Sequence, residues 1–230
     1  MDLIGMTGTG YIRSLEKIAL SNGIDLLGIA DLRNISGIRT YPRDLMRPYR
    51  YGLSLVISLD RFRDAYSFDI EEQIAFPLLR GVSCMIAKFI KNNGYGATTL
   101  DPNDGLRKSG PLYYKSKLSM KAVARAAGLG WIGKSAVFVS EKFGPRVCLG
   151  VVLTDMPLKA GKPMENKCGR CDRCARACPV GALTATCFEI HPSDLREVLQ
   201  REKCNDWMEG GSPTRGFCWE CILACPKGKK

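Results

Sequence analysis

The features that mark secreted and membrane proteins are missing from this sequence of 230 residues. Its first residues, MDLIGMTGTGYIRSLEK, lack the basic region and apolar core of a signal peptide. No stretch approaches the roughly 18 uninterrupted apolar residues of a membrane span. Nothing indicates the oxidising compartment that disulfides require. We therefore expect a cytoplasmic protein with no membrane partner, in which the presence of 11 cysteines indicates metal binding before disulfides.

Acidic residues are also scarce relative to basic ones. The chain has 34 Lys and Arg against 23 Asp and Glu, a formal net charge of +11. Deprotonated cysteines around bound metal would lower this by roughly 4, which still leaves a positive chain. A basic surface suits nucleic acid, an acidic redox partner or an anionic cofactor, and a solvated cationic surface would look the same.

The composition is otherwise that of an ordinary globular protein of one or two domains, with 45% hydrophobic and 25% charged residues. Residues 33–50 and 101–111 are predicted loops, and 155–167, with its prolines and glycines, is the predicted linker. Residues 136–140 and 147–154 should form a hairpin. Apolar spacing predicts helices at 11–22, 70–93 and 115–127, and strands at 24–30, 53–59, 95–100, 136–140 and 147–154.

Cysteine spacing is the most specific signal in the chain. The run Cys168-Gly-Arg-Cys171-Asp-Arg-Cys174-Ala-Arg-Ala-Cys178-Pro179 is the C-x2-C-x2-C-x3-C-P pattern of bacterial ferredoxins, whose fourth cysteine ligates the other of two clusters. A second run, C-x2-C-x3-C-P, supplies three more thiolates, and one cysteine between the runs completes eight. These four additional residues are Cys204, Cys218, Cys221 and Cys225. The spacing predicts two 4Fe–4S clusters.

The chemistry of a cubane explains this spacing. Each of four irons takes one thiolate, and two-residue gaps let one tight loop reach three of them. The three-residue gap begins a helical turn that directs the fourth thiolate elsewhere, and Pro179 and Pro226 prevent that turn from continuing. Zinc is less suited, because its sites usually combine two C-x2-C pairs around one ion.

A glycine-rich segment matches two nucleotide-binding patterns. Gly128-x-Gly130-x-x-Gly133 fits the dinucleotide fingerprint, and Gly128 to Ser135 fits the P-loop. Both mechanisms need a strand before the glycines and a helix after them, whereas here a predicted helix comes first. Nucleotide binding is therefore disfavoured. The open alternatives are a helix C-cap with a tight crossing, or a backbone packed against a large flat ligand.

Several of these motifs together resemble a known family. Ala127–Lys134 (AGLGWIGK), Leu149–Asp155 (LGVVLTD), Asn22–Ala30 (NGIDLLGIA) and the cysteine runs are similar to epoxyqueuosine reductases. They are more distantly similar to corrinoid reductive dehalogenases.

The resemblance implies an α+β fold in two domains. Residues 1–160 would form a nitroreductase-related, cobalamin-binding-type α/β domain, and residues 161–230 a two-cluster bacterial ferredoxin-like domain. Electrons from a low-potential donor would pass through the clusters to the cobalt of a bound cobalamin, which would reduce an unknown substrate. The corrin would lie along Gly128, Gly130, Trp131, Gly133 and Lys134. One cluster would be held by Cys168, Cys171, Cys174 and Cys225, and the other by Cys178, Cys204, Cys218 and Cys221.

Two departures from the family bear on the substrate. The position of the family's catalytic acid is occupied by Tyr114, a candidate proton donor like the tyrosine of the dehalogenases, or else a half-buried aromatic residue. The family's helical-repeat region, which helps to bind tRNA, has no counterpart here, which counts against tRNA as a partner. An alternative function is an electron-transfer or activator protein that reduces a partner protein's cofactor and has no substrate of its own.

The remaining candidates are few. Cys84, Cys148 and Cys187 are surplus to two clusters and are expected to be buried thiols. His191 is expected to cap a helix, with a lower cobalt ligand as the alternative. Trp219 lies between Cys218 and Cys221 and is expected to shield a cluster from water.

Overall fold

A computed structural model describes residues 8–35, 37–62, 71–103, 116–188, 195–211 and 218–228. The chain forms two compact units, each assembled from segments that are separate in the sequence. The sheet unit comprises Met1–Ser58, Asp69–Leu129 and Cys148–Met164, and the cysteine unit comprises Leu59–Phe68, Gly130–Val147 and Glu165–Lys230. The sequence-based division into residues 1–160 and 161–230 assigns a role to each part, and it stays a prediction.

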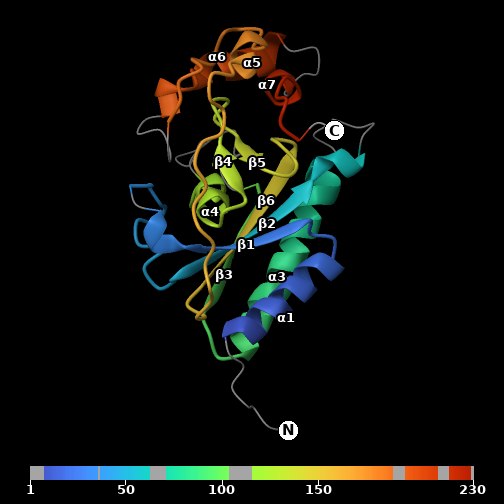
Figure 1. The fold of residues 1–230 in the computed structure, drawn as a ribbon, viewed down its shortest axis with the longest axis vertical. Helices are drawn as coiled ribbons and strands as arrows, with labels where there is room; N and C mark the ends of the chain where they lie inside the picture. The colour runs from blue at the N-terminus through green and yellow to red at the C-terminus, as the bar shows by residue number, and fades with distance from the viewer. Residues whose placement is uncertain are drawn as a thin grey trace. The chain divides into compact units, whose positions relative to one another are not determined.

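A four-stranded sheet organises the sheet unit (Figure 1). Its spatial order is β1-β2-β6-β3. β1 pairs antiparallel with β2, with Leu26 opposite Val56, and β3 pairs antiparallel with β6. The strands, which match four of the predicted ones closely, are β1 (Leu26–Asp31), β2 (Tyr51–Ser58), β3 (Ala97–Leu100) and β6 (Val147–Thr154).

Helices cover both faces of this sheet. α3 (Phe76–Asn92) packs Leu79 and Ser83 close to Gly150 of β6. The next residue of β6, Val151, points to the opposite face because side chains alternate along a strand. Val151 packs there in a cluster with Val123 of α4. The helices of this unit are α1 (Gly8–Ser21), which lies beside α3 in Figure 1, α3 itself, and α4 (Met120–Ala126).

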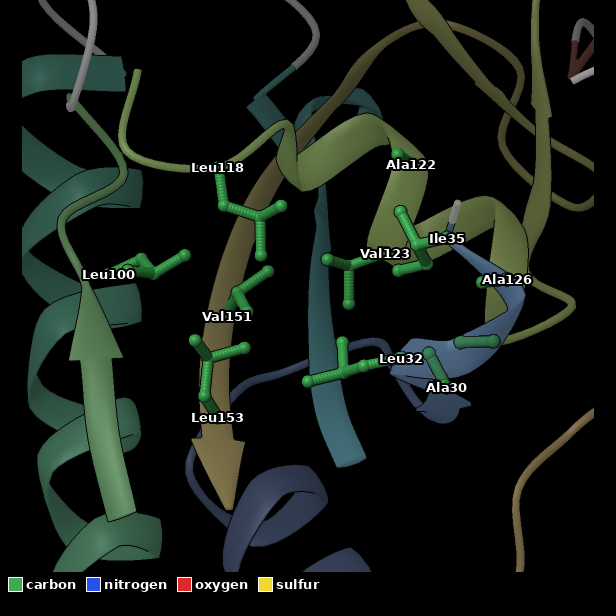
Figure 2. Close-up of a cluster of buried hydrophobic side chains, with 11 residues drawn as sticks. Ala30, Leu32, Ile35, Leu100, Leu118, Ala122, Val123, Ala126, Val151 and Leu153 are labelled. Carbon is green, nitrogen blue, oxygen red and sulfur yellow. The ribbon is translucent and has the colours of Figure 1, made fainter. Parts of the chain in front are cut away.

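The α4 face of the sheet carries a compact aliphatic core. Figure 2 shows Val123 of α4 directed toward Leu32 and Leu153, with Leu118 and Val151 above them. Leu118, Val123, Val151 and Leu153 are all 0% exposed. This packing holds α4, which ends at Ala126, against the sheet.

One helical stretch, Gln73–Asn92, is long and apolar enough to cross a membrane by length and composition alone. It begins within the π-helical turn Glu71–Ala75 and continues through α3. Leu79, Val82, Ile86 and Ile90 lie one turn apart and are buried in the sheet unit, as in the core helix of a soluble protein. The cytoplasmic location stays a prediction.

The cysteine unit contains a small hairpin that differs from the predicted one. β4 (Gly130–Ile132) pairs antiparallel with β5 (Phe138–Ser140). The predicted pairing of residues 136–140 with 147–154 is wrong, because β6 belongs to the four-stranded sheet. The glycine-rich segment itself supplies the partner strand.

Short helices punctuate the cysteine-bearing part of this unit: α5 (Arg173–Arg176), α6 (Arg201–Asp206) and α7 (Glu220–Leu223). A 3₁₀ turn at Leu195–Glu197 and a π-turn at Trp207–Gly211 flank α6. Residues 155–167 form neither helix nor strand, as predicted for the linker.

Candidate metal centre

Four cysteines gather around the first loop of the cysteine unit. Burial raises the pKa of the Cys174 thiol, and the negative charges of Cys168, Cys225 and Cys171 raise it further. The pKa of Cys225 is likewise raised, first by burial and then by Cys168 and Cys171. These mutual effects indicate that Cys225 lies near three cysteines that come about fifty positions earlier in the sequence. We call Cys168, Cys171, Cys174 and Cys225 the first set.

The other four cysteines form a second set: Cys178, Cys204, Cys218 and Cys221. Burial raises the pKa of Cys204, with further contributions from Cys178 and Cys218. The pKa of Cys221 is raised to about 12, again mainly by burial and then by nearby cysteines of this set and Cys174. The influence of Cys174 on Cys221 indicates that the two sets are neighbours.

Local backbone structure explains how the spacing produces these sets. The N–H of Cys171 donates to the carbonyl of Cys168 at 3.0 Å, which closes a tight turn helped by the left-handed φ of +53° at Gly169. The chain then enters α5, and the N–H of Cys178 donates to the carbonyl of Ala175 at 3.2 Å as that helix ends. The helical turn thus separates Cys178 from the preceding cysteines, as the spacing predicts.

The donor chemistry fits iron–sulfur clusters better than a single ion. Among the residues that the structure describes, no three His, Cys, Asp or Glu side chains come close enough to share one metal ion. A cubane takes one thiolate at each iron, so its ligands stand farther apart than the four ligands of a zinc ion. Because metal binding requires thiolates, the raised thiol pKa values imply that protons are released when iron binds.

Cysteines of both sets accept hydrogen bonds from nitrogen donors, including the backbone N–H of Ala175 at Cys174 and of Lys227 at Cys225. In the first set, the indole Nε1–H of Trp131 donates to Cys168 Sγ at 3.4 Å. In the second set, the backbone N–H of Ala182 donates to Cys178 Sγ at 3.2 Å. Such bonds stabilise negative charge on a cluster and help to set its potential.

A buried ion pair also lies near the first set. Arg146 is 4% exposed, and its Nε donates to Asp60 Oδ1 at 2.6 Å. Its positive charge opposes the rise in the pKa of Cys225. Sequence reasoning missed both residues, because nothing in their local sequence connects them with the cysteines.

The glycines predicted to lie along a corrin are accounted for by close packing within the protein. Gly128 has φ of +79°, and a Cβ there would lie 2.7 Å from the carbonyl oxygen of Lys162. A Cβ at Gly130 would overlap the carbonyl oxygen of Val139, its neighbour across the hairpin. A Cβ at Gly133 would lie 2.8 Å from Val139 Cγ2. Close packing against backbone at Gly128 and Gly130, and against side chains at Gly133, therefore accounts for the three glycines without a ligand.

The side chains of the same segment are turned to the first cysteine loop. Trp131 is 2% exposed and Lys134 is 8% exposed. Lys134 Nζ donates to the carbonyl of Gly169, the residue after Cys168, at 2.8 Å. The glycine-rich segment and the first cysteine loop are thus joined, an arrangement that sequence reasoning did not anticipate.

Asn166 is a second residue that sequence reasoning missed. Its Nδ2 donates to the carbonyl of Ile132 at 2.9 Å, and its Oδ1 accepts the N–H of Cys168 at the same distance. One amide side chain therefore ties the hairpin to the first ligand position. Its place two residues before the cysteine run is the only sequence signal that could have identified it.

The other predicted residues have mixed outcomes. Tyr114 and His191 lie outside the described residues. Cys148 is buried as expected, but the expectation is wrong for Cys84 and Cys187, which are exposed. Cys84 lies on the exposed side of α3, because other residues of the helix form the apolar face that is buried.

Comparison with known proteins confirms the predicted ferredoxin-type region. Residues 162–184 match the 4Fe-4S binding domain family. The matched segment contains the first cysteine run. An epoxyqueuosine reductase from Gloeobacter violaceus is 52% identical over 113 residues, which cover 46% of this chain and 34% of that protein.

The chain is similar to epoxyqueuosine reductases. The resemblance inferred from the sequence is thereby confirmed. The matches cover about a third of the length of the curated relatives. Their activity is therefore not transferred to this chain on similarity alone.

Solved structures share the fold over almost the whole chain. A crystal structure of epoxyqueuosine reductase with an epoxyqueuosine-modified tRNA stem loop has a TM-score of 0.68 and 21% identity, covering 96% of this chain and 66% of that one. A reductive dehalogenase structure described in terms of B12-dependent dehalogenation has a TM-score of 0.72 and 17% identity, covering 100% of this chain and 34% of that one. The mixed α/β architecture with a ferredoxin-like region is common to all three.

Proposed function

We propose that this chain is an iron–sulfur oxidoreductase that holds two 4Fe–4S clusters and passes electrons from a low-potential donor to a bound corrinoid, which reduces a substrate. The observation that carries the proposal is the grouping of eight cysteines into two sets of four. Burial and neighbouring cysteines raise the pKa of Cys174 and Cys225 in the first set, and of Cys204 and Cys221 in the second. The ferredoxin-type sequence match supports the same cofactor.

The first set would hold one cluster and the second set the other. When bound, each cluster accepts and releases single electrons at a potential set by its ligands, hydrogen bonds and exposure to solvent. The protein's own contribution at the first set is a buried cation, Arg146, and an indole donor, Trp131. Both stabilise negative charge on the sulfur ligands.

The corrinoid part of the proposal is supported by the fold, which is shared with the structure described for B12-dependent dehalogenation. A nitroreductase-related architecture for residues 1–160 is part of the same proposal. Trp131 and Lys134 do not fit as direct corrinoid contacts, because their side chains are buried against the cysteine loop. Gly130 and Gly133 are buried as well, and Gly128 is half-buried.

Tyr114 stays the predicted proton donor. A tyrosine with its ordinary pKa of about 10 is protonated at neutral pH and can supply a proton to a developing anion. A Tyr114→Phe variant should bind iron normally and lose substrate reduction. Normal turnover in that variant would contradict the assignment.

Anaerobic reconstitution with iron and sulfide tests the proposal directly. Iron analysis should give about eight irons per chain for two cubanes, and about four would contradict the second cluster. Adding cobalamin to the reduced protein should change the visible spectrum of the cobalt. Failure of cobalamin to bind would remove the corrinoid from the proposal and leave the clusters in place.

The related structure with a tRNA stem loop bears on the partners. The doubt about tRNA that the sequence raised is not confirmed. Arg39, Arg43 and Arg47 are exposed in the segment before β2, where they could meet phosphates or an acidic protein. We propose testing a tRNA stem loop by gel shift, in which affinity should fall steeply with salt. Salt-independent binding, or none, would contradict an RNA partner.

The same exposed arginines favour the alternative of an activator that reduces another protein's cofactor. An acidic redox protein would associate faster at low salt, because opposite charges steer encounter. Co-purification of such a partner, with turnover that needs both proteins, would support this function. Reduction of a small organic substrate by the isolated chain with a chemical reductant would exclude it.

A further inference from the structure

The Trp131 indole is held in place from several sides within the cysteine unit. It lies on β4 opposite Val139 and is 2% exposed. The Lys227 ammonium stands 5.9 Å from the centre of the ring, and Lys227 is only two residues beyond Cys225. A buried tryptophan usually finds a partner for its N–H, and here that partner is Cys168 Sγ at 3.4 Å.

The surroundings bring the indole to the sulfur and keep it there. A Cβ at Gly133 would stand 3.7 Å from Cys168 Sγ and 2.8 Å from Val139 Cγ2, so a larger residue would push these groups apart. Lys134 Nζ holds the carbonyl of Gly169 at 2.8 Å, which fixes the backbone just after Cys168. Gly133, Trp131 and Lys134 thus together fix the position of Cys168 and the backbone that follows it.

We propose that Trp131 raises the reduction potential of the cluster held by the first set, through its hydrogen bond to Cys168 Sγ. This inference rests on the ligand assignment in the proposed function. A reduced cluster carries one more negative charge than an oxidised one, so an N–H donor to a ligand sulfur stabilises the reduced form more. The effect is strong because the donor is buried, where electrostatic interactions are less screened than in water.

The two clusters differ in this respect. In the second set, Cys178 Sγ accepts the backbone N–H of Ala182, which every non-proline residue can supply at that position. The first set also has backbone donors, Ala175 at Cys174 and Lys227 at Cys225. In addition it has a side-chain donor, Trp131, which can be altered by a single substitution. Trp131 therefore gives the protein a means of setting one potential independently of the other.

The test is an EPR-monitored redox titration of the reconstituted full-length chain. In Trp131→Phe the first cluster should titrate at a lower potential than in the wild type, with unchanged iron content and an unchanged second potential. The signal missing from Cys171→Ser identifies the first cluster. The matched control is Trp207→Phe, whose ring packs against Gly211 near the second set and should leave both potentials unchanged.

Three outcomes would overturn the inference. Unchanged potentials in fully loaded Trp131→Phe would show that the hydrogen bond has no role. Equal shifts in Trp131→Phe and Trp207→Phe would indicate a general effect of losing an indole. A wild-type chain that assembles no cluster would instead refute the proposed function, and the inference with it.

A second measurement decides the question if Trp131→Phe does not fold. The Trp207→Phe/Trp219→Phe variant keeps Trp131 as the last of the 3 tryptophans. With indole ¹⁵N labelling, pulsed EPR of the reduced first cluster should detect coupling to the Trp131 nitrogen. Absence of that coupling would overturn the inference.

Discussion

The sheet unit and the cysteine unit are stabilised in different ways. In the sheet unit, side chains such as Leu15, Leu53, Leu79 and Ile86 are 0% exposed and pack on both faces of one sheet. In the described part of the chain after residue 164, the buried apolar side chains are Ala182, Leu183 and Val198. The helices α5, α6 and α7 bury no residue completely.

The fold of the described cysteine-bearing segments is therefore not stabilised by a large apolar core. Small protein parts that cannot bury enough apolar surface need metals or cross-links to fold. Residues 130–147 supply a small apolar cluster to this unit, in which Trp131, Ile132 and Phe138 are buried. The segments beyond them have polar contacts such as those of Asn166, and on the proposed function they would also depend on the sulfur ligands.

Removing iron should therefore have the largest and most one-sided effect. After chelation, residues 165–228 should lose hydrogen-exchange protection, because ligand binding supplies much of their folding free energy. The strands β1, β2 and β6 should keep their protection. Hydrogen exchange followed by mass spectrometry makes this comparison, and equal loss in both units would contradict it.

Loss of one ligand should give a smaller effect of the same kind. Cys171→Ser should lose about half of the bound iron, since only one of the two proposed clusters would depend on it. Soluble yield should also fall. The control is Cys84→Ser, which changes an exposed cysteine on α3 and should keep full iron content. Unchanged iron in Cys171→Ser would show that the assignment of the first set is wrong.

A cavity in the core of the sheet unit should lower stability without changing iron content. Leu153 is 0% exposed in the α4 face core, and Leu153→Ala should lower the free energy of unfolding by about 2–5 kcal/mol. Denaturation followed by circular dichroism measures this loss. Iron content per folded chain should not change. The exposed Leu20, at 54%, gives a matched control in Leu20→Ala, which should change stability by less than about 0.5 kcal/mol.

The smallest expected effect concerns an ion pair at the end of β1. Hydrogen bonds from Arg33 hold the pKa of Asp31 at about 2, below its ordinary 3.8, with help from Arg50. This carboxylate therefore stabilises the fold fully above pH 3.8, and the contribution is lost as the pH falls toward 2. Thermal unfolding of wild type and Asp31→Asn should differ at neutral pH and converge near that lower limit. A constant difference across this range would contradict the assignment.

Much of the fold could be read from local patterns. The apolar spacing of residues 11–22 and 70–93 predicts α1 and α3, because helical periodicity is a property of neighbouring residues. The order of helix and strand around Gly128 argues against nucleotide binding, and α4 followed by β4 agrees with it. The partner of β5 could not be read this way, because pairing depends on which strand is nearby in space.

Cysteine spacing and short motifs were enough to infer a 4Fe–4S-binding region and a similarity to epoxyqueuosine reductases, because such signals are local and specific. The residues that surround these cysteines could be identified only in the tertiary structure. Trp131 lies 37 positions before Cys168 and Arg146 lies 86 positions after Asp60, yet each pair is in direct contact. Contacts across such separations depend on how the whole chain packs, and no local pattern encodes them.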